Sequence, residues 1–162
     1  MLTESPECSW GSEREVGAMQ GYFLDQDQGE VVNLGVVSMR LIVSKAQTNG
    51  AFGVAEFGGS EGPWTVPHVH RRMEESFYVL EGTFAFTCGD IEVEAKEGAF
   101  LMVPRGMPHV MRAGPGGGRL LAVFAPAGLE GMFLELGRLP ADSITDPDVR
   151  AEIASRHDSI PV

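Results

Sequence analysis

The segment GPWTVPHVHRRMEESFYVLEG, residues 62–82, contains the most informative pattern in the chain. His68 and His70 are two residues apart, so on a β-strand both imidazoles would project from the same face. Glu75 can reach the same interior if the chain bends after Arg72 and resumes as a strand. Inward-facing histidines beside a carboxylate would be costly in an apolar barrel unless they share a purpose.

A second segment, GAFLMVPRGMPHVMRA, covers residues 98–113 and adds His109. An antiparallel barrel can bring such a strand alongside the one that carries His68 and His70. Three imidazoles and one carboxylate form a ligand set suited to borderline divalent transition metals. The alternative is that these histidines are surface or core residues without a shared role, and a His-x-His pair alone has little specificity.

Short runs rich in β-branched and apolar residues surround both segments, and glycine- and proline-containing turns separate them. This pattern indicates an all-β sandwich, jelly roll or barrel. Turns are expected at Thr48-Asn49-Gly50 and at Gly114–Gly118. The expected strands are Val36–Val43, Ala51–Phe57, Glu75–Leu80, Thr83–Cys88, Ile91–Ala95, Ala99–Val103, His109–Arg112 and Arg119–Phe124.

The last part of the chain changes to a helical pattern. An apolar stripe at i, i+3, i+4 and i+7 predicts one helix, with Gly137 as its C-cap. Asp146 followed by Pro147 predicts the start of a second helix. We therefore expect an N-terminal arm or edge strand over residues 1–30, a barrel over 31–126 and a helical extension over 127–162. The helices could cover the barrel mouth or pack against its side.

Composition excludes several classes of protein. The chain has 162 residues, of which 43% are hydrophobic, and a net charge of −11. This charge argues against nucleic acid and anionic membrane surfaces as partners. No signal peptide and no apolar run of roughly 20 residues is visible, so we expect a cytoplasmic protein. Cys8 and Cys88 form no Cys-x-x-Cys pair and are expected to be free thiols.

The spacing of fixed positions resembles the two cupin motifs. The first motif matches at Gly62, His68, His70, Glu75 and Gly82, and the second at Gly98, Pro104, Gly106 and His109. The second motif usually ends in Asn, where this chain has Ala113. Gly82 and Gly98 are expected to need positive φ in tight turns.

The resemblance implies a cupin jelly-roll β-barrel with one or two C-terminal helices, often a homodimer. It also implies one divalent transition metal, Fe, Mn, Ni, Cu or Zn, bound by His68, His70, Glu75 and His109. The chain looks similar to small bacterial monocupins of the quercetinase-like dioxygenase group, in which Glu75 would be both metal ligand and catalytic base. The alternatives are a non-oxidative cyclase, isomerase or lyase of secondary metabolism, or a non-enzymatic cupin that binds a small molecule.

Alternation along the strands also predicts a substrate pocket. Residues that share a face with the histidines and Glu75 would line it, and they are mainly apolar and aromatic. This lining favours a planar, hydrophobic substrate of the aromatic, polyketide or flavonoid kind. The alternative for each of these residues is ordinary core packing. Arg71 and Arg72 could pair with a substrate carboxylate or remain solvated. The candidate pocket residues are Phe52, Val66, Phe77, Val79 and Met111.

Overall fold

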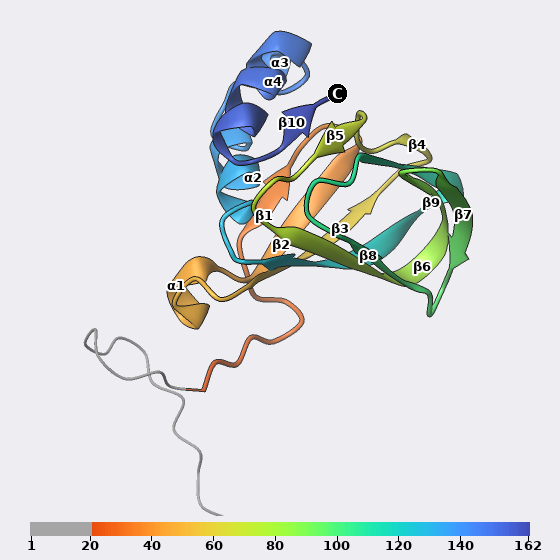
Figure 1. Ribbon diagram of the computed structural model, residues 1–162. Helices are drawn as coiled ribbons and strands as arrows, with labels where there is room; N and C mark the ends of the chain where they lie inside the picture. The colour runs from red at the N-terminus through yellow and green to blue at the C-terminus, as the bar shows by residue number, and fades with distance from the viewer. Residues whose placement is uncertain (1–20) are drawn as a thin grey trace, which may run out of the picture.

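The structure is a computed structural model that describes residues 21–162. The prediction for the N-terminal arm and for Cys8 therefore falls largely outside the described residues. The strands join into a single antiparallel sheet that closes into a barrel, which confirms the predicted all-β jelly roll (Figure 1). Its strands are β1 (Val31–Asn33), β2 (Val37–Val43), β3 (Gly53–Gly59), β4 (Gly62–Pro63), β5 (His68–Val69), β6 (Glu74–Cys88), β7 (Ile91–Lys96), β8 (Phe100–Val103), β9 (His109–Ala125) and β10 (Ile160–Pro161).

Two long strands organise the barrel. β6 and β9 pair along almost their whole length, from Glu74 opposite Ala125 to Cys88 opposite His109. β6 replaces two expected strands, because the register shifts between Val79 and Phe84 bend it without ending it. These two strands form the frame on which the ends of the barrel are built.

The expected turn at Gly114–Gly118 is wrong, because these residues lie inside β9. Gly116 and Gly117 have positive φ and bend the strand, and at Gly117 the end of β3 comes close to it. A Cβ on Gly117 would lie 2.1 Å from the carbonyl oxygen of Gly59, so only glycine fits there. The expected turn at Thr48-Asn49-Gly50 instead follows a short helix, α1 (Lys45–Thr48), whose left-handed C-cap is Asn49.

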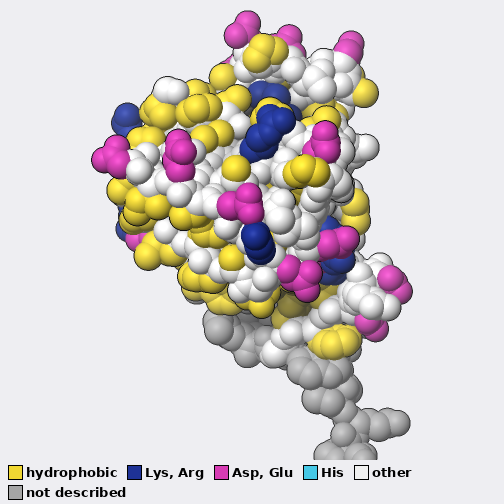
Figure 2. Space-filling model, turned by 90° about the vertical axis from the view of Figure 1, so that its right-hand side faces the viewer, with side chains coloured by type: hydrophobic (Ala, Val, Ile, Leu, Met, Phe, Trp, Pro, Cys, Tyr) yellow, Lys and Arg dark blue, Asp and Glu magenta, His cyan; other side chains and the backbone are white. Residues whose placement is uncertain are grey.

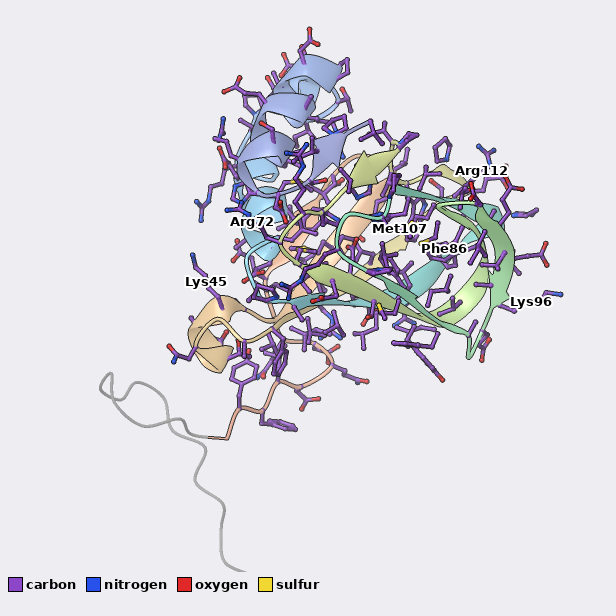
Figure 3. The ribbon with its side chains drawn as sticks, viewed as in Figure 1. Lys45, Arg72, Phe86, Lys96, Met107 and Arg112 are labelled. Atoms are coloured by element: carbon purple, nitrogen blue, oxygen red, sulfur yellow. The ribbon has the colours of Figure 1, made fainter. Side chains whose placement is uncertain are left out.

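The barrel core is aromatic and aliphatic, as the alternation of the strands predicts. Phe77, Phe84 and Phe124 are almost fully buried. In Figure 3, Phe86 points into the barrel, whereas Lys96 points away from it. Burial of these large side chains supplies the main stabilisation of the fold.

The C-terminal helices lie together next to the barrel (Figure 1). They are α2 (Glu130–Leu136), α3 (Ala141–Ile144) and α4 (Pro147–Arg156). Gly137 is the C-cap of α2, and the side chain of Asp146 accepts hydrogen bonds from the first turn of α4, as predicted. Beyond α4 the chain returns to the barrel, where β10 pairs with β5. In the part of the chain that is described, no helix has the length and apolarity needed to span a membrane.

Candidate metal centre

Three separate strands bring the predicted ligand residues to one end of the barrel. His68 lies on β5 directly opposite His109 on β9. Glu75 lies near the start of β6, where it pairs with Phe124 of β9 and Val103 of β8. His70 follows β5 in the bend that leads to β6. The backbone N–H of Gly106 donates to the carbonyl of His70 at 2.6 Å, which ties the turn before His109 to this bend.

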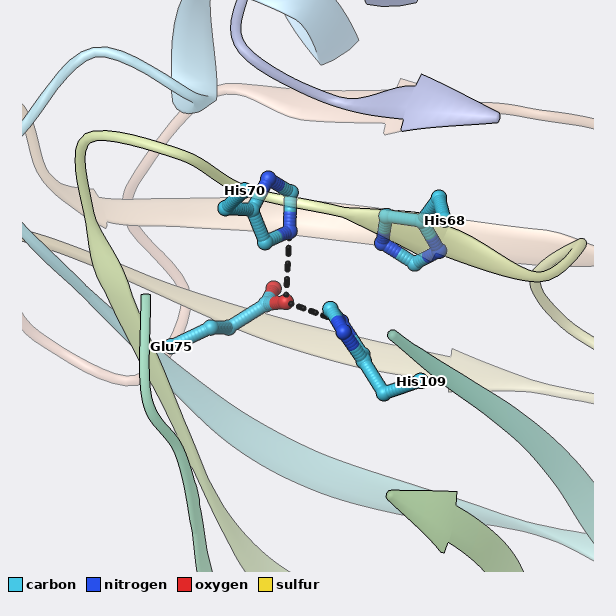
Figure 4. A group of neighbouring side chains, drawn as sticks. All are labelled: His68, His70, Glu75 and His109. Carbon is cyan, nitrogen blue, oxygen red and sulfur yellow. Dashed lines mark hydrogen bonds and ion pairs between the residues drawn. The ribbon is translucent and has the colours of Figure 1, made fainter. Parts of the chain in front are cut away.

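All four side chains are buried and converge (Figure 4). One possible ligand atom from each lies within 4.8 Å of the others. His70 is 2% exposed and Glu75 5% exposed. Oε2 of Glu75 lies 3.0 Å from Nε2 of His70 and 3.1 Å from Nε2 of His109. The face drawn in Figure 2 shows no histidine among the described residues, which agrees with this burial.

The other ring nitrogen of each histidine is held by a backbone carbonyl. Nδ1 of His68 contacts the oxygen of Val66 at 2.8 Å, and Nδ1 of His109 contacts that of Met107 at 3.1 Å. Nδ1 of His70 donates to the oxygen of Asp158 at 2.7 Å. A carbonyl can only accept, so each Nδ1 carries a proton. In the neutral ring, each Nε2 then presents its lone pair, the arrangement that metal-ligating histidines show.

Burial and the charge of Glu75 determine the protonation of the site. Burial opposes ionisation of Glu75, but hydrogen bonds from His109 and His70 outweigh it and hold its pKa at about 2. Burial, together with the nearby His109, lowers the pKa of His68 to about 4. Burial also opposes the charged form of His70, but the hydrogen bond to Glu75 outweighs it and raises its pKa. The cluster thus combines an anionic carboxylate with an imidazole that favours its neutral form.

This donor set fits a divalent metal ion. Without an ion, His70 and His109 each face an acceptor at both ring nitrogens, which only an imidazolium satisfies fully. A divalent cation would replace the Nε2 protons as the partner of the carboxylate and the rings. The cluster of His68, His70, Glu75 and His109 can therefore hold a metal, and its nitrogen and oxygen donors leave the identity of the metal open.

Asp158 supports this site from the far end of the chain, which the sequence analysis missed. Its carbonyl accepts from His70, and its carboxylate accepts from the backbone N–H groups of Arg71 and Arg72 at 3.2 and 2.8 Å. The residue is buried and has a left-handed φ of 62°. The sequence around Asp158 contains no motif that marks it as a partner of His70, because the two residues are 88 positions apart.

A cavity of about 440 Å³ adjoins the cluster and includes His68 and Glu75 in its wall. Its other walls are the barrel interior, the β1–β2 and β4–β5 connections, and helices α2 and α4. The helices therefore cover the barrel mouth, one of the two expected arrangements. The size is that of an ordinary small-molecule site, and the wall is mostly apolar.

The candidate pocket residues divide into two groups. Val66, Phe77 and Met111 line the cavity. Val79 is fully buried in the core, and Phe52 is exposed just before β3; neither is part of the wall. Register explains Val79, because it faces inward further along β6, beyond the end that carries Glu75.

The charged residues next to the ligands lie outside the cavity, and the residue in place of the motif asparagine is buried. Arg71 and Arg72 are exposed and are not part of the cavity wall. Glu74 faces outward and pairs with Arg105 at 2.7 Å. Ala113, in place of the motif asparagine, is buried and lies opposite Gly62 of β4 and Phe84 of β6.

Comparison with known proteins agrees with this geometry. Residues 56–124 match the family model described as a cupin domain. A quercetin 2,3-dioxygenase of Bacillus subtilis (strain 168) is 29% identical over 116 residues, which cover 72% of this chain and 34% of that protein. The chain therefore spans about a third of the length of that curated relative.

Solved structures of several proteins have similar folds. KdgF from a Halomonas species has a TM-score of 0.60 at 16% identity, covering 66% of this chain and 94% of that one. The polyketide cyclase RemF from Streptomyces resistomycificus has a TM-score of 0.57 at 25% identity, and the match covers 65% of this chain and 80% of RemF. An RmlC-like cupin from Shewanella frigidimarina has a TM-score of 0.57 at 21% identity, and the match covers 67% of this chain and 93% of that protein. The likeness to KdgF and to the RmlC-like protein concerns the fold alone.

Proposed function

Because this chain is a member of the cupin superfamily, we propose that it is a metal-dependent enzyme acting on a small, mainly apolar organic molecule. His68, His70, Glu75 and His109 are the metal ligands of this proposal. The observation that carries it is the orientation of the three imidazoles: each Nδ1 is bound to a backbone carbonyl, and the ligand atoms converge beside one carboxylate.

When bound, a divalent ion would supply a Lewis-acidic position for a substrate oxygen and, if redox-active, reactivity with dioxygen. The residues of the chain do the remaining work. Glu75 is ionised at neutral pH, because its pKa is held at about 2, and its wall position lets it accept a proton from a substrate hydroxyl. The apolar wall excludes water from the molecule that lies beside it.

We place a dioxygenase first. The supporting observation is the similarity to quercetin 2,3-dioxygenase over 116 residues, which cover 72% of this chain. Aromatic side chains in the wall, such as Phe57, Phe77 and Trp64, suit a planar ring system of the flavonoid or polyketide kind. In this function, Glu75 is both ligand and base.

A non-oxidative cyclase is the second candidate. The likeness to the polyketide cyclase RemF supports it, at 25% identity over 65% of this chain. The same residues would serve, since polarising a carbonyl and moving a proton require the ligand cluster and Glu75 but no dioxygen.

The cytoplasmic location and the homodimer stay predictions. Size-exclusion chromatography with light scattering measures the oligomeric state.

Oxygen dependence separates the two functions. Protein loaded separately with Fe, Mn, Ni and Cu is incubated with a panel of flavonols and polyphenols while oxygen uptake is recorded. The dioxygenase predicts uptake in proportion to substrate consumed, and none with Glu75→Gln. Turnover under strict anaerobiosis would instead support the cyclase, and failure of the protein to bind any of the metals would contradict both.

A further inference from the structure

Arg150 of α4 lines the same cavity as His68 and Glu75. Among the described residues it is the only lysine or arginine in the cavity wall, and Glu75 is the only carboxylate there. The rest of the wall is mostly apolar, with Phe57, Phe133 and other core side chains facing the space. A guanidinium in such a wall is a fixed positive charge next to a site for an organic molecule.

Within residues 21–162, Arg150 has no carboxylate partner. Nη1 donates to the carbonyl of Ile144 at 3.0 Å, the one hydrogen bond that its side chain makes there. Asp148 and Glu152, each two residues away in sequence, form no ion pair with it, and Glu152 pairs with Arg156 instead. Asp146, four residues before it, uses its carboxylate to cap the first turn of α4. Burial without a compensating anion lowers the pKa of Arg150. Arg119, by contrast, forms an ion pair with the carboxylate of Glu56.

The unused N–H groups of Arg150 must face open space. No fully buried side-chain nitrogen or oxygen among the described residues lacks a hydrogen-bond partner. The guanidinium has five N–H donors, and one bond to Ile144 leaves most of them to solvent or to a ligand. Since the residue is half-buried and forms part of the wall, the cavity is where a ligand can reach these donors.

We propose that Arg150 binds a carboxylate of the substrate, so that the cavity takes an aryl carboxylate whose apolar body lies between Arg150 and the His68–Glu75 end. The identification of this molecule as the substrate rests on the proposed function; the binding itself does not. Arginine presents two parallel N–H groups that match a carboxylate. A phosphate fits less well beside Arg150, because no second lysine or arginine among the described residues lines the wall.

The test uses matched probes on the full chain, both metal-free and loaded with Zn²⁺. Naphthalene-2-carboxylate and biphenyl-4-carboxylate are titrated calorimetrically beside their primary amides, which keep the shape and lose the charge. Because the amides lose the charge-assisted bond, the carboxylates should bind about 10- to 100-fold tighter than the amides in both forms. Arg150→Gln should abolish this preference, whereas Arg150→Lys should keep part of it.

Arg112→Gln is the matched control, because Arg112 is exposed on β9 and points away from the barrel (Figure 3). It should leave the preference unchanged. Equal binding of acids and amides by the unmodified protein, or no binding of either acid, contradicts the inference while leaving metal binding intact. A preference that survives in Arg150→Gln and disappears without Zn²⁺ would assign the carboxylate to the ion, which overturns the role of Arg150 but supports the metal site. Failure to bind metal, with the preference retained, would overturn the proposed function alone.

Discussion

The backbone carbonyl of Asp158 accepts a hydrogen bond from Nδ1 of His70, at 2.7 Å and across 88 residues of chain. The same residue binds the backbone of Arg71 and Arg72 through its carboxylate. The strand that follows it, β10, pairs with β5. The C-terminus thus fixes both the bend that carries His70 and the orientation of its ring.

Asp158→Ala should weaken metal binding. The substitution removes the carboxylate that holds the bend and places alanine in a left-handed conformation that it adopts poorly. Loss of such supporting bonds costs about 10–100-fold in metal affinity. Competition with a chromophoric chelator measures the affinity. Asp158→Asn, which tolerates this φ and keeps one acceptor, should show a smaller loss; equal affinity of the unmodified protein and Asp158→Ala would contradict the role of Asp158.

Glu75→Gln should lower turnover while the barrel remains folded. The amide keeps the volume of Glu75 but cannot accept a substrate proton, so kcat should fall by about 10²-fold or more even with saturating metal. Steady-state kinetics with metal analysis of the same sample separates loss of base from loss of ligand. Glu74→Gln is the control, since Glu74 faces outward and pairs with Arg105. A kcat for Glu75→Gln within a few-fold of the unmodified enzyme would contradict its role as base.

Gly82→Ala should destabilise the fold more than Gly98→Ala. Both glycines have the predicted positive φ, 81° and 86°. This conformation costs an L-residue about 1–2 kcal/mol. Only at Gly82 would the added Cβ also lie 2.4 Å from the carbonyl oxygen of Gly117, whereas Gly98 has open space. Urea unfolding measures the free energy of unfolding of both variants. An equal decrease in the two would show that the close approach of Gly117 to Gly82 has no cost.

Glu56 should make stability depend on pH. Burial opposes its ionisation, but hydrogen bonds from Arg40 and Arg119 outweigh it and lower its pKa below 4.5. The stabilisation is therefore present above pH 4.5 and is lost as pH falls through the lower folded pKa. Because solvent screens these partly exposed ion pairs, Glu56→Gln should cost up to about 1 kcal/mol near neutral pH and less in acid. Urea unfolding of both proteins near neutral pH and below pH 4.5 measures this cost, with the exposed Glu94→Gln as control. A loss of stability that does not change with pH would contradict the role of Glu56.

The spacing of His68, His70, Glu75 and His109 could be interpreted from sequence, because strand alternation and the turns between strands are local properties. The same reasoning separated the barrel from the helices and identified the caps at Gly137 and Asp146. It failed where glycines bend a strand without ending it, as at Gly116 and Gly117 in β9.

The supporting residues of the site could not be predicted, since long-range packing determines them. Arg150 becomes a wall residue only because α4 covers the barrel mouth. Asp158 reaches His70 only because β10 returns to β5. Val79 and Phe52 show the converse, since alternation says which face a residue occupies but not how far along the barrel the cavity extends.

Anomalous X-ray scattering from crystals of metal-loaded protein tests the convergence of the four ligands most directly. We expect one peak per chain, within coordination distance of Nε2 of His68, His70 and His109 and of a carboxylate oxygen of Glu75, and no such peak in His70→Ala. A peak elsewhere, or an unchanged peak in His70→Ala, would contradict it.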